Sequence, residues 1–528
     1  MASMNVTVSF LMEGPADPAL EPYVLYREHV RPVLEDRRGL LDAMYAPVIG
    51  RPETDPVLLA GVTLLQYMER LPDRQAVERC RFDARWRMAL RLDERWDGLD
   101  ASTLCVFRAR LAEHAQGRLV LDAGIEAMRR AGYLGKRRAI RSDSTHVLGK
   151  LAKLSRLECV RETLRIGLRF LSAWGGPEAW DPWFSRYAEQ NPKHLRRASA
   201  AHLQTTMTQA GEDLHAILAR AQELGRTVQD SEPVRLLQRV FEEQFDRGAN
   251  GCVAQRRATP SGAIHNPHEP EAQWSTKHSK EWVGYKLQVA ETAPEQVRAR
   301  GEPTEAVITA MVVQPAIASD QTSIEPVLAV QTNTLQEMPE TVFADAGYVN
   351  APALERAQTA GYELCGPAAA PPNSSKQLGS DTFAVDLPSR TAICPNGKRS
   401  CGCIRIAESG RQAVYFFFTW SLSDCSVCPL AKDCLSKRSA QPRRTLQVGE
   451  KHMLIQARRQ LCRTPEYQLR MQRRNGIEGT QSECVRGYGA RRCRYRGLAR
   501  TGVQMQFIGA ACNLRRWANR RCWLDRNG

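Results

Sequence analysis

The spacing of hydrophobic residues changes several times along the chain, and each change marks a different kind of predicted element. Between residues 55 and 135, apolar side chains recur at intervals of three, four and seven positions, as at Val57, Leu64 and Met68. This spacing is typical of amphipathic helices, in which such positions share one face. The pattern therefore predicts an all-helical N-terminal unit, with a boundary at residues 1–135.

Runs typical of strands alternate with helical patterns in the middle of the chain. The expected strands are residues 138–142, 282–289, 306–313, 341–344 and 362–365. The expected helices are residues 323–332 and 351–359, and a long helical insertion at about 151–250 follows the first strand. Such an order predicts an α/β fold over residues 136–365, with a mixed sheet and helices packed on both of its faces.

The last third of the chain has two parts that differ in composition and in predicted structure. Residues 366–450 are rich in Pro, Gly, Ser and Cys, with one strongly β-prone run at 414–420, and we expect them to form an inserted module. A helical pattern returns over residues 451–528. No repeat of fixed period is visible in the chain.

Positive charge is concentrated in this C-terminal part. From Lys437 to Gly528 the chain has 22 Lys and Arg against 5 Asp and Glu, an excess of +17, whereas the whole chain carries +16. The preceding residues are therefore close to neutral. An excess of this kind is the footprint of a polyanionic partner, most simply the backbone of a nucleic acid.

The composition of the chain indicates the cellular compartment in which we expect the protein. The chain has 528 residues, 43% of them hydrophobic, and no apolar run approaches the roughly 18 residues that a membrane span needs. Its sixteen cysteines are spread over a long chain, and half of them occur singly, unlike those of a small secreted disulfide scaffold. We expect a protein of the reducing cytoplasm with no membrane partner.

Three acidic residues are the candidate catalytic groups. Asp143 and Asp345 each follow a predicted strand, and Glu478 is isolated within the most basic stretch of the chain. Carboxylate oxygens are the ligands that Mg²⁺ prefers, and phosphodiester chemistry commonly uses two such ions. The alternatives are structural: Asp143 as a helix cap, Asp345 as a turn residue, and Glu478 as the partner of nearby arginines.

The order and context of these acids resemble the DDE transposases of bacterial insertion sequences. Arg141-Ser142-Asp143-Ser144-Thr145-His146 is similar to the segment with the family's first aspartate, and Phe343-Ala344-Asp345-Ala346-Gly347-Tyr348 to the second. Arg474-x3-Glu478-Gly479-Thr480 is similar to the glutamate block, which is the most specific part of the resemblance. The resemblance runs from roughly residue 50 to 520, and the N-terminal helices are similar to the family's helical transposase domain.

This resemblance implies a ribonuclease H-like catalytic domain that cleaves and joins double-stranded DNA at terminal inverted repeats. Asp143, Asp345 and Glu478 would bind two Mg²⁺ ions, for which Mn²⁺ can substitute. A homodimer in a synaptic complex, associated with the bacterial nucleoid in the cytoplasm, is the expected assembly. Two other readings stay open: a ribonuclease H-like nuclease without joining activity, and a catalytically inactive DNA-binding regulator.

The chain departs from the better-known branch of the family beside the glutamate. That branch has a tyrosine and a lysine where this chain has Met471 and Val485, and Arg486 is the candidate replacement for the lysine. Glu483 is a competing acid, but Arg474 lies one helical turn before Glu478. The candidate DNA-binding residues are Arg474, Arg486, Arg491, Arg492, Arg494, Arg496 and Lys286, with solvated side chains as the alternative.

The inserted module has cysteines at a metal-binding spacing. Cys425-x2-Cys428-x5-Cys434 follows Cys394, Cys401 and Cys403, and two cysteines separated by two residues can share one tetrahedral ion. We expect a structural Zn²⁺ held by Cys394, Cys425, Cys428 and Cys434. Reduced cysteines without a ligand are the alternative.

Overall fold

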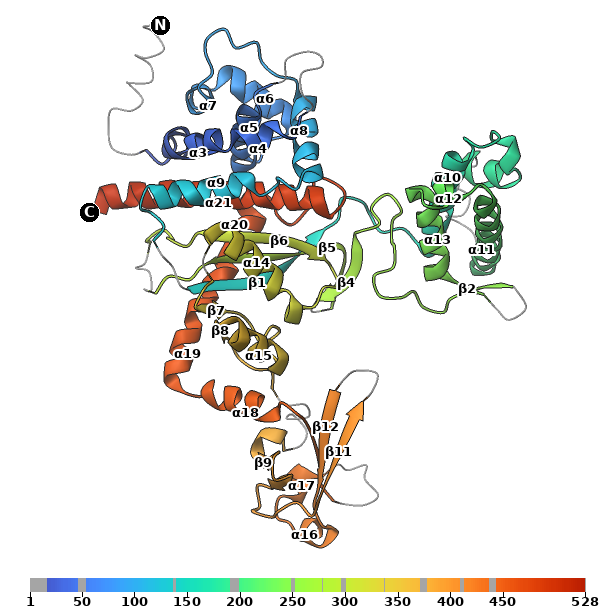
Figure 1. Ribbon diagram of the computed structural model, residues 1–528, viewed down its shortest axis with the longest axis vertical. Helices are drawn as coiled ribbons and strands as arrows, with labels where there is room; N and C mark the ends of the chain where they lie inside the picture. Colours follow the sequence, from blue (N-terminus) through green and yellow to red (C-terminus); the bar gives the residue numbers. More distant parts are fainter. Residues whose placement is uncertain are drawn as a thin grey trace.

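The chain folds into a central sheet with helical and β-rich parts around it, seen in a computed structural model (Figure 1). The N-terminal helices cover one side of the sheet, a helical bundle stands to one side, and a small β-rich module lies beyond the far end. The structure describes residues 17–45, 54–135, 139–189, 199–247, 252–277, 279–295, 301–336, 338–370, 378–408, 413–435 and 443–527.

The N-terminal part is helical throughout its described residues. Aspartates begin three of its helices, because the carboxylates of Asp55, Asp83 and Asp100 accept hydrogen bonds from backbone N–H groups of the first turn. The elements are α2 (Glu21–Leu25), η1 (Tyr26–Val30), α3 (Arg31–Asp36), α4 (Arg38–Asp42), α5 (Pro56–Glu69), α6 (Asp73–Phe82), α7 (Ala84–Leu90), α8 (Ala101–Glu113) and α9 (Leu119–Arg130).

The central sheet has six strands, and its topology confirms the expected ribonuclease H-like mixed sheet. Its strands are β1 (Ala139–Leu148), β4 (Gln273–Lys277), β5 (Lys280–Thr292), β6 (Ile308–Pro315), β7 (Thr341–Phe343) and β8 (Glu363–Cys365). The path β5-β1-β7-β8 runs through the sheet, and both β4 and β6 pair with the outer edge of β5. β1, β7 and β8 are parallel, whereas β5 is antiparallel to β1 and to β6.

Alternation along β1 assigns each side chain to one face of the sheet. Even-numbered Ile140 packs with α14 (Ile324–Leu335) and α15 (Ala351–Ala360). Odd-numbered Val147 instead belongs to the core shared with α20 (Gly476–Tyr488) and α21 (Leu498–Asn527). Helices therefore cover both faces, and an odd-numbered residue of β1 points to the side of α20.

The basic C-terminal helix α21 is a core element of the protein. It contacts β6 on one side and α2, α5, α8 and α9 on the other, so it lies between the sheet and the N-terminal helices. One hydrophobic core joins all three, and it includes Phe507, Ile508 and Trp517 of α21. The N-terminal helices and the sheet are consequently not packed as separate units.

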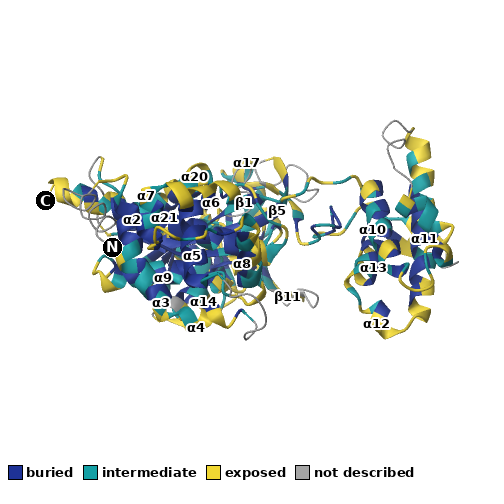
Figure 2. Cartoon of the chain, turned by 90° about the horizontal axis from the view of Figure 1, so that it is seen from above, coloured by how far each residue is buried: buried dark blue, intermediate teal, exposed yellow. Residues whose placement is uncertain are grey.

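The segment between β1 and β4 forms a second body with a hydrophobic core of its own. Figure 2 shows this body apart from the main one, with its own buried centre. Ser155 and Glu158 form a capping box at its first helix. Its elements are α10 (Arg156–Leu171), η2 (Glu178–Trp180), η3 (Ser185–Glu189), α11 (Ala200–Glu223), α12 (Arg226–Gln229), α13 (Glu232–Gln244), β2 (Phe245–Arg247) and β3 (Val253–Gln255).

The cysteine-rich part consists of two small sheets around a core that includes Phe383, Phe418 and Trp420. Its elements are η6 (Ser380–Thr382), β9 (Ala384–Asp386), β10 (Thr391–Ile393), β11 (Gly402–Glu408), β12 (Ala413–Thr419), α16 (Leu422–Ser426), α17 (Ala431–Cys434) and β13 (Thr445–Gly449). The chain returns to the central sheet through α18 (His452–Leu461), α19 (Pro465–Met471) and η7 (Gln472–Asn475), which leads directly into α20.

Candidate active site

Asp143 lies within β1, whereas the short β-prone run of residues 138–142 had suggested that the strand ends before it. Pairing with the long strand β5 carries β1 on to Leu148, and Asp143 is opposite Val289. Arg138 lies outside the described residues. The Asp143 side chain is half-buried, and its Oδ1 accepts a 2.7 Å hydrogen bond from the N–H of Ser144. A paired strand therefore holds this carboxylate.

Asp345 follows β7 by two residues. The parallel register pairs Arg141 with Phe343, two residues before each aspartate, so Asp143 and Asp345 leave this pairing toward the same end of the sheet. Adjacent strands lie about 4.8 Å apart. Asp345 Oδ1 accepts a 2.8 Å hydrogen bond from the N–H of Gly347, so the turn fixes this carboxylate. The two candidate aspartates therefore come from neighbouring strands.

Glu478 lies in the first turn of α20, which packs against β1 and β5. Its side chain is 67% exposed, and its carboxylate lies 3.4 Å from Arg474 Nη2. The competing acid Glu483 lies 2.7 Å from Arg516 Nη2 and is less exposed. Because a carboxylate in a close ion pair with a buried arginine is less available as a ligand than one in a longer, exposed pair, this contrast favours Glu478 over Glu483.

The carboxylates of Asp143, Asp345 and Glu478 are ligands of the kind that bind a hard divalent cation, but in this structure they do not form a complete binding site. Across the described ranges, no group of three or more His, Cys, Asp or Glu side chains could hold a metal ion as placed. All three residues supply carboxylate oxygens, which are the ligands that Mg²⁺ prefers. The two aspartates are fixed by backbone hydrogen bonds, whereas Glu478 extends into solvent. Binding of an ion by all three would thus require Glu478 to turn inward.

A fourth acid, Asp320, lies near Asp345 and was missed by the sequence analysis. A Cβ atom on Gly347 would meet Asp345 Oδ1 at 3.1 Å and Asp320 Oδ2 at 3.6 Å, so the two carboxylates are near neighbours. Asp320 Oδ1 accepts hydrogen bonds from Ser144 Oγ at 3.2 Å and from Lys286 Nζ at 3.0 Å. Asp320 begins a short 3-10 helix after β6, and no motif around it marks this position in the sequence.

The carboxylates of the site affect the pKa of the nearby Tyr348 hydroxyl. Burial raises the pKa of its hydroxyl well above the usual range, and the charges of Asp320 and Asp143 raise that pKa further. The hydroxyl therefore stays protonated, and it donates a 2.7 Å hydrogen bond to Gln288 Oε1. Tyr348 is thus a fixed donor behind the carboxylates.

Lys286, a candidate phosphate contact, is engaged by the protein. Its ammonium donates to Asp320 Oδ1 and to the carbonyl oxygen of Ala318, and its side chain is 15% exposed. Two of its three N–H donors are thus used within the protein, which leaves one for a phosphate. Lys286 is opposite His146 in the sheet, two residues beyond Ser144.

The candidate arginines divide into two groups by exposure. Arg491 donates to Thr145 Oγ1 at 3.2 Å and to the His146 carbonyl, and burial lowers the pKa of its guanidinium. Arg494 stacks over the ring of Tyr67 at 4.9 Å and donates to the Leu71 carbonyl. Arg486, Arg492 and Arg496 are exposed. The first group joins parts of the protein, and only the second presents its charge to solvent.

The cysteines of the β-rich module gather in space. Burial raises the pKa of the Cys434 thiol, and the nearby thiols of Cys425, Cys428 and Cys394 raise it further. Backbone N–H groups of Lys398 and Arg444 point at two sulfurs, at 3.4 Å from Cys394 Sγ and 3.5 Å from Cys425 Sγ. The four expected thiols are therefore neighbours, although, among the side chains that the structure describes, they do not yet form a group that could hold an ion.

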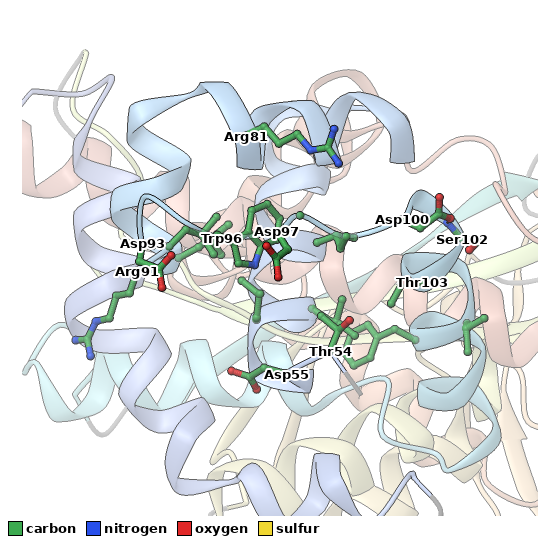
Figure 3. Close-up of a pocket in the computed structure, with 18 of the residues that line it drawn as sticks. Thr54, Asp55, Arg81, Arg91, Asp93, Trp96, Asp97, Asp100, Ser102 and Thr103 are labelled. Atoms are coloured by element: carbon green, nitrogen blue, oxygen red, sulfur yellow. The ribbon is translucent and has the colours of Figure 1, made fainter. Parts of the chain in front are cut away.

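A pocket of about 940 Å³ opens between the N-terminal helices (Figure 3). Its lining mixes both signs of charge, with arginines such as Arg81 and Arg91 near aspartates such as Asp93, Asp97 and Asp100. A lining of balanced charge does not produce the positive field that attracts a nucleic acid. This pocket is built from the N-terminal helices and contains none of the candidate catalytic acids.

Two family models match the chain. Residues 393–518 match a model described as "Transposase DDE domain", and residues 20–110 match one described as "Transposase domain (DUF772)". Together the matches span less than half of the chain. The first contains Glu478, whereas Asp143 and Asp345 lie between the two. No curated protein matches the chain.

Among solved structures, the chain is similar to a piggyBac transposase seen by cryo-electron microscopy in a synaptic complex with hairpin DNA. The identity is 8% and the TM-score is 0.31, and the alignment covers 98% of this chain and 80% of that one. At this TM-score the likeness is too distant to place any residue of the site. In the part of the chain that the structure describes, no helix combines the length and the apolar character needed to cross a membrane.

Proposed function

We propose that this chain, which is a DDE transposase, binds its divalent metal ions through Asp143, Asp345 and Glu478. The observation that supports this proposal is the parallel register of β1 and β7, which directs Asp143 and the Asp345 that follows β7 toward the same end of the sheet, where α20 with Glu478 packs on β1 and β5. Dependence on a divalent metal follows from the family, and Mg²⁺, replaceable by Mn²⁺, is the ion that an all-carboxylate donor set favours.

Each acid has a distinct part in this proposal. A bound divalent ion neutralises charge at the phosphorus and activates the attacking water or 3′-hydroxyl. Asp143 and Asp345 supply oxygens that the sheet and its turn hold in place. Glu478 would supply the third carboxylate once it parts from Arg474. Arg474 would then have its guanidinium available for a DNA phosphate.

The substrate is DNA, and we propose that its recognised sites are the terminal inverted repeats of a mobile element. Arg486 in α20 and Arg492 and Arg496 after it are exposed, which supports their proposed contact with the phosphate backbone. Two ends must be held together before joining, so the proposed assembly is a homodimer. Arg491 and Arg494 contribute to DNA binding indirectly, because they hold the arginine-rich segment after α20 against β1 and the N-terminal helices.

For the β-rich module we propose a structural Zn²⁺ on Cys394, Cys425, Cys428 and Cys434. The proximity of the four thiols and the two N–H groups aimed at sulfur support it. A core as small as this one gains from a metal cross-link. Closure around an ion would require the sulfurs to move together from their present positions.

A plasmid assay tests the catalytic proposal. Purified protein is incubated with Mg²⁺ and a plasmid carrying candidate terminal repeats from the flanking DNA, and nicked, cut and joined products are separated on a gel. Asp143→Asn, Asp345→Asn and Glu478→Gln should each abolish cleavage while end binding persists, and Glu483→Gln should still cleave. Cleavage retained by any of the first three would overturn the assignment.

The same assay separates the other readings of the site. Joined products with the wild-type protein support transposition. Cut products without joining would point to a nuclease, and binding without any break would point to a regulator.

A further inference from the structure

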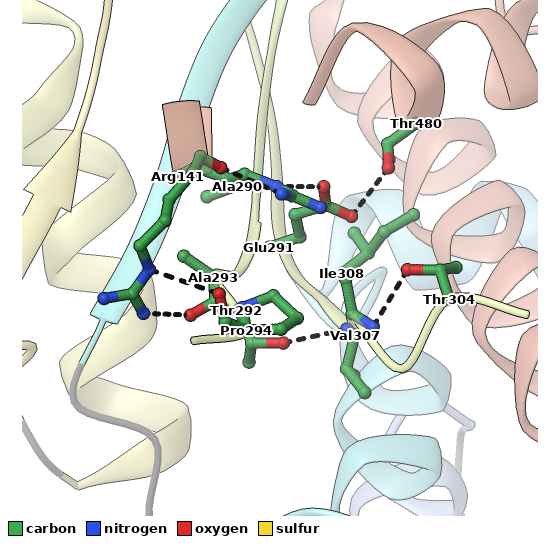
Figure 4. A network of polar contacts seen from close by, with 12 residues as sticks. Arg141, Ala290, Glu291, Thr292, Ala293, Pro294, Thr304, Val307, Ile308 and Thr480 are labelled. Carbon is green, nitrogen blue, oxygen red and sulfur yellow. Dashed lines mark hydrogen bonds and ion pairs between the residues drawn. The ribbon is translucent and has the colours of Figure 1, made fainter. Parts of the chain in front are cut away.

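Glu291 is a fully buried carboxylate that lies outside the candidate metal-binding triad. Its side chain is 0% exposed, and both of its oxygens are occupied (Figure 4). Oε1 accepts from Arg141 Nε at 2.6 Å, and Oε2 accepts from Thr480 Oγ1 at 2.7 Å and Arg516 Nη1 at 2.8 Å. Arg516 is itself only 5% exposed. Three elements, β1, α20 and α21, thus meet on one carboxylate of β5.

The partners of Glu291 flank the candidate catalytic acids. Arg141 is opposite Glu291 in the β1–β5 register and lies two residues before Asp143 on the same face. Thr480 lies two residues after Glu478. Glu291 therefore connects the strand of the first acid with the helix of the last, although 335 positions separate Asp143 from Glu478 in the sequence.

The same network fixes the start of α20. Arg141 Nη1 donates a 2.9 Å hydrogen bond to the carbonyl of Arg473 in η7, the turn before the helix. A Cβ atom on Gly476, the first residue of α20, would overlap the Arg141 guanidinium. The close approach of this turn to Arg141 therefore needs a residue without a side chain.

Apolar packing alone would leave the position of α20 less defined. The helix buries Ile477 and Cys484 against the core, and such contacts tolerate small rotations and shifts. Hydrogen bonds to a buried charge are directional, and leaving that charge unpaired is costly. The contact from Thr480 to Glu291 thus selects one rotation and one height of the helix.

We propose that Glu291, acting through Thr480, is a positioning residue for Glu478. It sets the rotation of α20 about its axis so that Glu478 reaches the ion held by Asp143 and Asp345. This inference rests on the proposed function, because it concerns the same metal site. It also explains the threonine of the Glu478-Gly479-Thr480 block, whose hydroxyl is buried and contacts no metal ligand.

The test is Thr480→Val, which removes the hydroxyl and keeps the shape of the side chain. Cleavage is measured against Mg²⁺ concentration, with end binding and melting temperature recorded beside it. The Mg²⁺ concentration for half-maximal cleavage should rise by about 10-fold, the lower end of the effect of removing a group that hydrogen-bonds a metal ligand directly, because Thr480 acts on Glu478 only through the helix. End binding should remain, and Thr480→Ser should restore the wild-type metal dependence.

Thr163→Val is the matched control. Thr163 is also buried, and its hydroxyl donates to the Cys159 carbonyl within α10, in the helical body between β1 and β4. This variant should lose similar stability without any change in metal dependence. Should Thr480→Val fail to fold, Glu291→Gln gives the second measurement, and a shift in metal dependence is expected there as well.

Glu478→Gln, measured in parallel, separates the two proposals. If it still cleaves, the proposed function fails. If it is inactive while Thr480→Val, or Glu291→Gln in its place, shows wild-type Mg²⁺ dependence, the positioning role of Glu291 is overturned and the proposed function stands.

Discussion

Gly476→Ala should destabilise the protein, although the same change in most helices is stabilising. Gly476 has helical backbone angles, with φ −62° and ψ −22°, so alanine is allowed there and helix propensity alone would favour it by about 1 kcal/mol. The added Cβ, however, would overlap the Arg141 guanidinium, which Glu291 and the Arg473 carbonyl hold in place.

The size of the expected loss of stability follows from the displacement of the Arg141 guanidinium. Removing one partner from a buried ion pair costs about 3–5 kcal/mol. Set against the gain of about 1 kcal/mol in helix propensity, the net loss is about 2–4 kcal/mol. For a cooperative unit of this size, 1 kcal/mol shifts the melting temperature by about 2–4 °C, so a fall of roughly 4–16 °C is expected.

Differential scanning calorimetry measures this shift. Gly487→Ala, in the same helix, is the control, because an added Cβ there has no neighbour nearer than Glu483 Cγ at 4.0 Å. Its melting temperature should be unchanged or slightly raised. A Gly476→Ala protein as stable as the control would refute the rigid contact between Arg141 and the start of α20.

Three further predictions concern DNA, zinc and the catalytic metal. Arg492→Ala and Arg496→Ala should each reduce the slope of the logarithm of the DNA-binding constant against the logarithm of salt concentration by about 1, because each exposed charge displaces counterions; fluorescence anisotropy measures this slope. Arg494→Ala should leave the slope unchanged and lower the melting temperature, since Arg494 stacks on Tyr67. Elemental analysis should find one Zn²⁺ per chain, lost in Cys425→Ser and retained in Cys252→Ser, whose exposed cysteine lies outside the module; zinc-free wild-type protein would remove the structural ion. Chelation by EDTA should stop cleavage without releasing DNA ends, and Mg²⁺ or Mn²⁺ should restore it; cleavage that persists in EDTA would contradict metal dependence.

Local patterns foretold five of the six strands of the sheet, because each of the five contains a β-prone run, but they missed β4 (Gln273–Lys277), which pairs with the start of β5. They did not foretell the length of β1, since Asp143 to Leu148 become a strand only by pairing with β5. The positions of Asp143 and Asp345 were marked by local motifs. Asp320 had no such mark, because its place depends on Lys286 and Ser144, which are distant in sequence.

Net charge was a poor guide to the individual arginines. The C-terminal excess of positive charge suggested a polyanionic partner, but one of the arginines that contribute to it, Arg516, is buried against Glu291 and Glu483. A count of charges does not include acids that a distant strand supplies. Removal of this basic part would therefore disturb the fold as well as DNA binding, because it would take α21 out of the core.

Metal selectivity of cysteine variants tests most directly whether the three acids are ligands of one metal site. Asp143→Cys, Asp345→Cys and Glu478→Cys each replace a hard oxygen with a softer sulfur, which Mn²⁺ accepts better than Mg²⁺. Each variant should be inactive with Mg²⁺ and regain cleavage with Mn²⁺, whereas Glu483→Cys should cleave with either ion. Full activity of Glu478→Cys in Mg²⁺, or no recovery of any of the three in Mn²⁺, would contradict a metal site built from these side chains.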